Sequence, residues 1–338
     1  MSAGTASRSS LPKVTIAIPT YNRRAYLEAA VASSLAQTYP HIEVVVSDNA
    51  STDDTAEWLR QQRDPRLVML SQSTNLGMMG NWDACLARAQ GSYFLLLSDD
   101  DLLEPEAVAR MVAVFEGAGN EPLGMVYGRA DIIGPQGELL SHGALAPTLE
   151  PASETIQGFF LSRRPTYPCT ILLRTADLRA AGGYSYAGLT LSCDARAWIA
   201  AALRHGHVGF VPEVVAQYRV HPGRLTSQSH IETWLDNNET LARYCAEACR
   251  ARGEARVAAR LLTLVQKMNA RSAMFLIRDI AELKQRPLGR VRRFLSLHRY
   301  FRSPQCLPTV LLMTAHLVKP PFVGQAVRRF KRLWQSPC

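Results

Sequence analysis

Three consecutive aspartates, Asp99 to Asp101, follow a short apolar run, Tyr93 to Leu97, and this junction constrains the fold most strongly. The run is continuously apolar and rich in strand formers, which predicts a strand buried on both faces of a parallel sheet. Ligands of open α/β sheets bind beyond the carboxyl ends of the strands, so the acidic cluster is expected at a binding site.

Carboxylates this close repel one another unless a cation or hydrogen-bond donors lie among them. We therefore expect Asp99 to Asp101 to hold a divalent metal and, through it, a diphosphate. A competing interpretation is that Asp101 caps a helix whose early turn holds Pro105 and Glu106.

Apolar and helical patterns alternate through the first part of the chain. Further strands are predicted at Val14–Ile18, Ile42–Ser47 and Leu67–Leu70. Helices are predicted between them at Tyr26–Gln37, Ala56–Gln62 and Gly80–Gln90. This alternation indicates βαβ units, so the expected class is α/β with a mostly parallel, Rossmann-like sheet.

The later segments are less regular. Strands are predicted at Leu123–Tyr127, Ala130–Ile133, Thr170–Leu173 and Val208–Val211, and His142–Pro151 is predicted to be a loop. Helices are predicted at Thr175–Ala181, Asp194–Arg204, Ile231–Arg250, Glu254–Asn269 and Ser272–Lys284. We expect a boundary near residue 225, where the pattern becomes wholly helical.

Charge is distributed unevenly around the overall net charge of +9. Residues 1–240 carry 18 Lys and Arg against 25 Asp and Glu, whereas residues 241–338 carry 20 against 4. The second part therefore suits an anionic partner, such as nucleic acid, anionic lipid or a phosphorylated acceptor. Seven cysteines without a CxxC pair favour a reducing cytoplasm over a disulfide framework or zinc site.

Polar signals follow several predicted strands and are expected to meet at one edge of the sheet. Tyr21 offers a ring for stacking a base, Asp48 an acceptor for base N–H groups, and Asp99 and Asp100 suit a ribose hydroxyl and a metal. Together they describe a nucleoside-diphosphate site, although Asp48 alone equally suits a turn and helix cap. Neither GxGxxG nor GxxxxGK[ST] occurs, so phosphate cradling by a glycine-rich loop is excluded.

The ordered series of motifs resembles family 2 glycosyltransferases of the GT-A fold. The motifs are Ile18-Pro19-Thr20-Tyr21-Asn22, Val46-Ser47-Asp48-Asn49-Ala50-Ser51-Thr52-Asp53, Asn75-Leu76-Gly77, Leu97-Ser98-Asp99-Asp100-Asp101, Gly182-Gly183-Tyr184 and Tyr218-Arg219-Val220-His221. The resemblance implies a catalytic domain at residues 13–225, after a disordered N-terminus (1–12) and before a helical, basic C-terminal region (226–338). It also implies a nucleotide-sugar donor (UDP-, dTDP- or GDP-linked), Mn²⁺ or Mg²⁺, and inversion at the anomeric carbon.

Site residues follow from the resemblance by position. Donor-binding roles fall to Pro19, Thr20 and Tyr21 at the nucleoside, Asp48 at the base, Asn75, Gly80 and Asn81 beside the donor, and Asp99 at the ribose or sugar. Asp100 is the implied principal metal ligand, with Asp101 and His221 as further candidates. Many relatives have aspartate where this chain has Ser98, so the division of roles among the three aspartates stays open.

An inverting transfer needs a base on the acceptor hydroxyl. Relatives carry a Glu-Asp pair at the start of a helix after the Gly-Gly-aromatic turn, and the matching position here is Asp194, preceded by Cys193. The alternative is that Asp194 only caps this helix. Arg219, His221 and Arg224 are expected to close over the diphosphate, the alternative being a structural histidine and solvated arginines.

The end of the chain is basic and amphipathic. Val323, Val327, Phe330 and Trp334 recur at helical spacing with four arginines and lysines between them, and Arg290–Arg302 has a similar composition. These segments suit an anionic membrane surface, the alternative being packing on the catalytic domain. No nucleic-acid recognition motif accompanies the charge, so nucleic acid is not an expected partner.

The resemblance and these observations together predict an inverting, metal-dependent transferase that moves one sugar to a glycan or lipid-linked acceptor in surface-glycan assembly. Its expected location is cytoplasmic or peripheral on the inner membrane face. The QxxRW signature of processive synthases is absent, which favours single-sugar transfer over polymerisation. Alternative functions are a nucleotidyltransferase that makes the activated sugar, and a non-catalytic scaffold that binds it.

Overall fold

The computed structural model describes residues 11–119, 122–223, 230–279, 287–301, 304 and 310–311. The chain divides into two compact units, Met1–Gln228 and Ser229–Cys338. Each unit is described by itself.

The N-terminal half of the first unit is a parallel βαβ array, as predicted. Its strands are β1 (Val14–Thr20), β2 (Ile42–Asp48), β3 (Leu67–Ser71) and β4 (Tyr93–Leu96). The intervening helices are α1 (Arg24–Leu35), α2 (Thr55–Gln61) and α3 (Gly77–Arg88). Every residue of β1, β2 and β4 is buried, which explains their continuously apolar or β-branched sequences.

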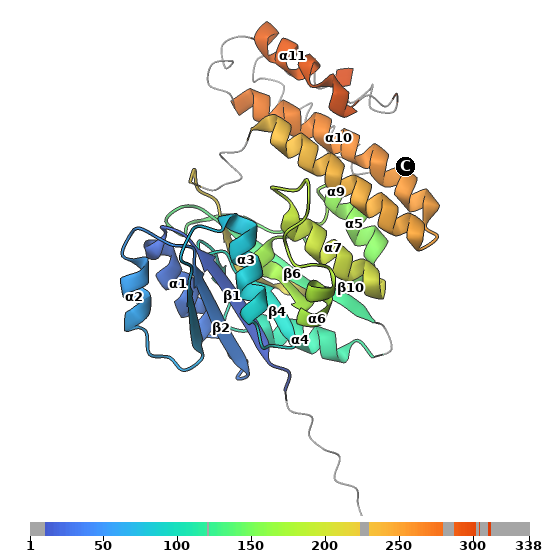
Figure 1. Cartoon of the computed structure of the whole chain (residues 1–338). Helices are drawn as coiled ribbons and strands as arrows, with labels where there is room; N and C mark the ends of the chain where they lie inside the picture. The colour runs from blue at the N-terminus through green and yellow to red at the C-terminus, as the bar shows by residue number, and fades with distance from the viewer. Residues whose placement is uncertain are drawn as a thin grey trace, which may run out of the picture. The chain divides into compact units, whose positions relative to one another are not determined.

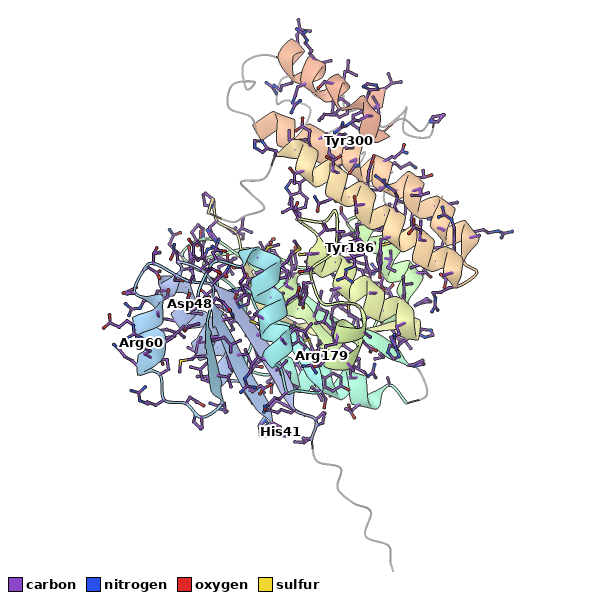
Figure 2. The ribbon with its side chains drawn as sticks, viewed as in Figure 1. His41, Asp48, Arg60, Arg179, Tyr186 and Tyr300 are labelled. Carbon is purple, nitrogen blue, oxygen red and sulfur yellow. The ribbon has the colours of Figure 1, made fainter. Side chains whose placement is uncertain are left out.

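Parallel register brings the carboxyl ends of these strands together. Val14 of β1 pairs with Ile42 of β2 and with Tyr93 of β4, and Thr20 at the end of β1 lies beside Asp48 at the end of β2. In Figure 2, Asp48 lies at one end of the sheet and His41, which precedes β2, at the other. The edge that carries Asp48 is therefore the edge where the loops after β1 and β4 begin.

The second half makes the sheet mixed rather than simply parallel. Its strands are β5 (Leu102–Leu103), β6 (Leu123–Ile133), β7 (Leu139–His142), β8 (Leu149–Pro151), β9 (Ile171–Arg174) and β10 (His207–Arg219). The order is β3-β2-β1-β4-β9-β6-β10-β5, with β7 on β6 and β8 on β10. Strand β9 is antiparallel to both β4 and β6, whereas β6 and β10 are parallel.

Two predictions for this half are wrong. The strands expected at Leu123–Tyr127 and Ala130–Ile133 form one continuous strand. Gly128 does not interrupt it. A glycine stands there because Val215 packs closely: a Cβ at this position would lie 2.4 Å from a methyl group of Val215. The expected loop at His142–Pro151 contains β8, which pairs with the start of β10 more than fifty residues later in the chain. No local pattern announces such a pairing.

Helices cover both faces of the sheet. Those of the second half are α4 (Ala107–Gly117), α5 (Ala152–Phe160), α6 (Thr175–Ala180) and α7 (Cys193–His205), with a 3₁₀ turn, η1 (Pro168–Thr170). Figure 1 shows α3 in front of β1 and β2, and α7 in front of β6 and β10. On the other face, α1 and α4 pack into one apolar cluster with alternate residues of the strands, such as Ile16, Val44 and Leu95.

The second unit is helical, as predicted. It contains α9 (Ile231–Ala251), α10 (Ala255–Asp279), α11 (Pro287–Ser296) and a 3₁₀ turn, η3 (His298–Phe301). The break predicted between Asn269 and Ser272 is absent, because no Gly or Pro interrupts the helical pattern there. Among the described residues, no helix is long and apolar enough to cross a membrane. The basic segment at 323–334 lies outside the described residues.

Candidate active site

The three aspartates lie where the parallel strands end, and all three are buried. Asp101 directly precedes the two-residue strand β5, and α4 begins only at Ala107 with Glu106 before it. The interpretation of Asp101 as a helix cap is therefore wrong. The aspartates form a compact acidic cluster beside the loops that follow β1 and β10.

Asp99 joins β4 to the loop after β1. One carboxylate oxygen accepts a hydrogen bond from the Thr20 hydroxyl at 2.8 Å, and the other lies 3.2 Å from the Arg23 guanidinium. Burial and the negative charge of Asp100 raise the pKa of Asp99 to about 6, against the opposing effect of Arg23.

Asp100 contacts two basic side chains that lie far away in the sequence. Its Oδ2 atom lies 2.9 Å from Nε2 of His221 and 3.0 Å from Nη1 of Arg23. Arg23 also donates to the carbonyl of Gly223, so it bridges the acidic cluster and the segment after β10. His221 is buried beside the Tyr26 ring, with 5.2 Å between ring centroids.

Asp101 lies deeper than its neighbours. Its Oδ1 atom accepts the backbone N–H of Arg219 at 2.8 Å. Its Oδ2 atom is buried and, within the described part of the chain, contacts no donor stronger than the Cys169 thiol. Burial and the charge of Asp100 hold the pKa of Asp101 well above its usual range.

Arg219 is buried and bound to backbone carbonyls, so the interpretation of it as a solvated loop arginine is wrong. Its guanidinium donates to the carbonyls of Asp100, Gly134 and Pro135 at 2.8, 3.1 and 3.1 Å. These bonds fasten the end of β10 to the acidic cluster. Arg224 lies outside the described residues.

The nucleoside side of the predicted site lies at the ends of β1 and β2. Pro19 and Thr20 are the last residues of β1 and are buried, whereas Tyr21 is 43% exposed and available for stacking. Asp48 is buried, and its Oδ1 atom accepts the backbone N–H of Ser51 at 3.0 Å. The turn-forming role considered for Asp48 is thus present, and its proposed contact with a base stays a prediction.

The predicted donor-side residues around α3 are held by a polar network. Asn75 accepts hydrogen bonds from the Gly77 N–H and the Asn49 amide. Asn81 is buried and exchanges hydrogen bonds with the Ser47 hydroxyl (2.6 Å) and carbonyl (3.0 Å). Gly80 lies in the same helix, close to Leu76. A Cβ added at Gly80 would lie 2.9 Å from the Cβ of Leu76. The network fixes the start of α3 against β2.

Asp194 lies in the first turn of α7, after Ser192 in a left-handed conformation (φ 56°). The Ser192 side chain makes no capping hydrogen bond, whereas the Asp194 carboxylate accepts backbone N–H groups of the first turn, so the capping alternative for Asp194 stays open. Burial raises the pKa of Asp194, and its backbone hydrogen bonds oppose this only in part. A carboxylate with a raised pKa is suited to accept a proton. Cys193 beside it is buried.

Metal binding at this cluster stays a prediction, because the described residues supply few ligands. No group of three or more His, Cys, Asp or Glu side chains in the described ranges is arranged to hold a metal. Asp100 and His221 nevertheless converge at 2.9 Å, and a carboxylate with an imidazole is a reasonable pair for Mn²⁺. Burial first, and the charge of Asp100 second, raise the pKa values of Asp99 and Asp101.

Sequence reasoning missed three contributors to this region. Arg23 is the counter-cation of the acidic cluster, Asn49 anchors the start of α3, and Asp83 binds the Gly-Gly-Tyr loop. Arg23 follows the Thr20-Tyr21-Asn22 motif directly, so its position next to a predicted ligand loop was the available signal. The partners of Asn49 and Asp83 depend on distant contacts.

The fold is that of the GT-A class of α/β proteins. The solved structure of S. aureus TarS 1–349 in complex with UDP-GlcNAc is similar, with a TM-score of 0.62 at 18% identity over 90% of this chain and 89% of that one. Residues 15–165 match the model described as glycosyl transferase family 2, and this part of the chain belongs to that family.

Two curated relatives are similar over part of the chain. A chondroitin synthase of Pasteurella multocida is 33% identical over 135 residues, which are 39% of this chain and 14% of that protein. A GalNAc(5)-diNAcBac-PP-undecaprenol beta-1,3-glucosyltransferase of Campylobacter jejuni is 33% identical over 132 residues, 38% of this chain and 41% of that protein. The matches thus cover much less than the full length of these relatives.

Proposed function

We propose that the chain is an inverting, metal-dependent glycosyltransferase that moves one sugar from a nucleotide-diphosphate sugar to an acceptor hydroxyl in surface-glycan assembly. The observation that carries the proposal is the convergence of Asp100, His221 and Arg23 at the sheet edge that also holds Asp48. Membership of glycosyl transferase family 2 favours this function over a nucleotidyltransferase or a scaffold.

The proposed reaction is a single displacement. Asp194 accepts the proton of the acceptor hydroxyl, whose oxygen attacks the anomeric carbon of the donor sugar. The bond from that carbon to the diphosphate breaks, and the nucleoside diphosphate leaves with the electron pair. Asp100 and His221, with Asp101 beneath them, would hold Mn²⁺ or Mg²⁺, which supplies positive charge to the leaving diphosphate.

The function is tested with the purified chain and a panel of UDP-, dTDP- and GDP-sugars, with and without Mn²⁺. We expect metal-dependent release of one nucleoside diphosphate, abolished by Asp194→Asn and by Asp100→Asn. The Asp64→Asn variant is the control, because Asp64 lies before β3 and its carboxylate binds the nearby Arg66. No turnover of any donor, or full turnover by Asp194→Asn, would contradict the proposal.

A lipid-linked acceptor at an anionic membrane is the proposed partner of the second unit. The name of the Campylobacter jejuni relative includes an undecaprenol diphosphate acceptor. In α11, Leu288 and Leu295 are 79% and 46% exposed and share a face with the exposed Arg292, whereas Phe294 is buried on the opposite side. Exposed leucines beside arginine, in a region with a large basic excess, suit an anionic bilayer.

Vesicle sedimentation tests this partner. We expect the full chain to bind vesicles of phosphatidylcholine with phosphatidylglycerol more tightly than pure phosphatidylcholine, and Leu288→Glu with Leu295→Glu to weaken that binding. The matched control is Leu140→Glu with Leu145→Glu, which changes two exposed leucines of the first unit. Equal binding by the two double variants would refute the assignment to α11.

A further inference from the structure

The carboxylate of Asp83 binds the loop between α6 and α7. It accepts hydrogen bonds from the backbone N–H groups of Tyr184 (2.7 Å) and Ser185 (3.1 Å), and from the Ser185 hydroxyl (2.5 Å). One carboxylate in α3 thus receives three donors from two consecutive residues that lie about a hundred positions later. Hydrogen bonds to an ionised acceptor are stronger than neutral ones.

The glycines of the loop make this approach possible. Gly182 and Gly183 have φ values of +82° and +71°, which side-chain-bearing residues rarely adopt. A Cβ at Gly183 would also lie 2.3 Å from Oδ1 of Asp83. The Gly-Gly-Tyr sequence is therefore shaped to receive this carboxylate.

The loop is held from the other side by α7. Arg196 is buried and donates to the carbonyls of Ala181 and Gly183. Asp83 thus binds the N–H groups of the loop and Arg196 binds its carbonyls. Arg196 lies two residues after Asp194, so the position of the loop and the position of the proposed base are coupled through α7.

The Tyr184 ring anchors the loop to α3. It is buried, packs edge-on against Trp82 with 5.2 Å between centroids, and lies near Phe94 of β4. Burial, followed by the negative charges of Asp194 and Asp83, holds the pKa of Tyr184 well above its usual range. The ring therefore packs between Trp82 of α3 and Phe94 of β4.

We propose that Asp83 is a positioning residue for sugar transfer, which fixes the Gly-Gly-Tyr loop and thereby aligns Asp194 with the acceptor hydroxyl. The inference rests on the proposed function. Helix α3 begins at the donor side of the proposed site, where Asn49 accepts the Leu76 N–H at 2.8 Å. Further along the same helix, Asp83 binds the loop that precedes Asp194. Asp83 therefore couples donor-side order to the geometry of the base.

The test compares Asp83→Asn, Asp83→Glu and the control Asp64→Asn, using the nucleotide sugar that the wild-type chain turns over in the panel. We expect Asp83→Asn to lower kcat about 10–100-fold, since small misplacements of a reacting group cost this much, with the donor KM changed less than about threefold. Asp83→Glu, which keeps the charge, restores part of kcat. Hydrogen exchange at the Tyr184 and Ser185 amides rises in Asp83→Asn.

Two results separate this inference from the proposed function. The first is that the wild-type chain turns over a donor and Asp83→Asn has an unchanged kcat, although exchange at the two amides is faster. This result overturns the positioning role of Asp83 and leaves the proposed function standing. No turnover by the wild-type chain overturns the proposed function and this inference with it. If Asp83→Asn does not fold, Ser185→Ala removes one of the three donors, and an unchanged kcat in that variant also overturns the role.

Discussion

Nε2 of His221 lies 2.9 Å from Oδ2 of Asp100, which joins the segment after β10 to the loop after β4 across 121 residues of sequence. Arg23 contacts the same carboxylate oxygen at 3.0 Å and continues to the carbonyl of Gly223. This short chain of contacts closes one side of the acidic cluster, and Arg23 supplies positive charge to Asp99 and Asp100.

Because the His221 imidazole contacts Asp100, the His221→Ala substitution is predicted to lower the affinity for the metal. We expect the Mn²⁺ concentration for half-maximal donor turnover to rise about 10–100-fold, the range typical for residues that ligate or orient a metal ligand. The control is His41→Ala, because His41 lies at the opposite end of β2 (Figure 2). An unchanged Mn²⁺ dependence in His221→Ala would remove this residue from the metal assignment.

Arg23→Gln is predicted to destabilise the first unit most when no divalent cation is added. The substitution leaves Asp99 and Asp100 without their shared guanidinium, and unpaired buried charge costs about 1–3 kcal/mol or more. We expect Mn²⁺ to recover part of the melting temperature. Arg24→Gln, which loses only exposed ion pairs with Glu28 and Asp54, is the comparison. Equal melting temperatures for the two variants without Mn²⁺ would contradict the prediction.

Asp194 predicts the direction of the pH dependence. A base must be ionised to accept a proton, so kcat rises as pH increases through the pKa of Asp194. Burial places that pKa above the ordinary aspartate value of 3.8, so the acid limb of the profile should lie above that value. Stopped assays across pH 4–9 with saturating donor measure it. A rate that increases as pH falls would exclude Asp194 as the base.

Arg196→Ala is predicted to lower the free energy of unfolding by about 2–4 kcal/mol. The substitution leaves the carbonyls of Ala181 and Gly183 without their buried charged donor and removes packing around a residue that is only 2% exposed. Urea unfolding measures the change. Arg204→Ala is the control in the same helix, since its side chain is 59% exposed. Similar losses in both variants would show that the buried hydrogen bonds are not the cause.

The parallel half of the fold was predictable because its signals are local. Three strands are fully buried: Val14–Thr20, Ile42–Asp48 and Tyr93–Leu96. A strand that is buried on both faces has a mostly apolar sequence, which can be recognised from the sequence alone. Strand β8 and its pairing with β10 were not predictable, because three residues carry no period and their partner lies far along the chain.

The candidate site divides in the same way. The acids were found because Asp99 to Asp101 interrupt an apolar pattern, and their place at the sheet edge follows from parallel register. The residues that surround these acids were not predicted correctly. Arg219 was expected to face phosphate, but its guanidinium donates to three backbone carbonyls. Side-chain direction at a strand end depends on tertiary contacts, which a single sequence does not reveal.

Calorimetric titration of UDP, dTDP and GDP into the purified chain, with and without Mn²⁺, tests the central claim most directly. The account predicts that one of these diphosphates binds at least tenfold more tightly with Mn²⁺, and that Asp100→Asn abolishes this gain while it keeps its cooperative unfolding transition. Binding that is indifferent to Mn²⁺ for all three diphosphates, or a full gain in Asp100→Asn, would contradict it.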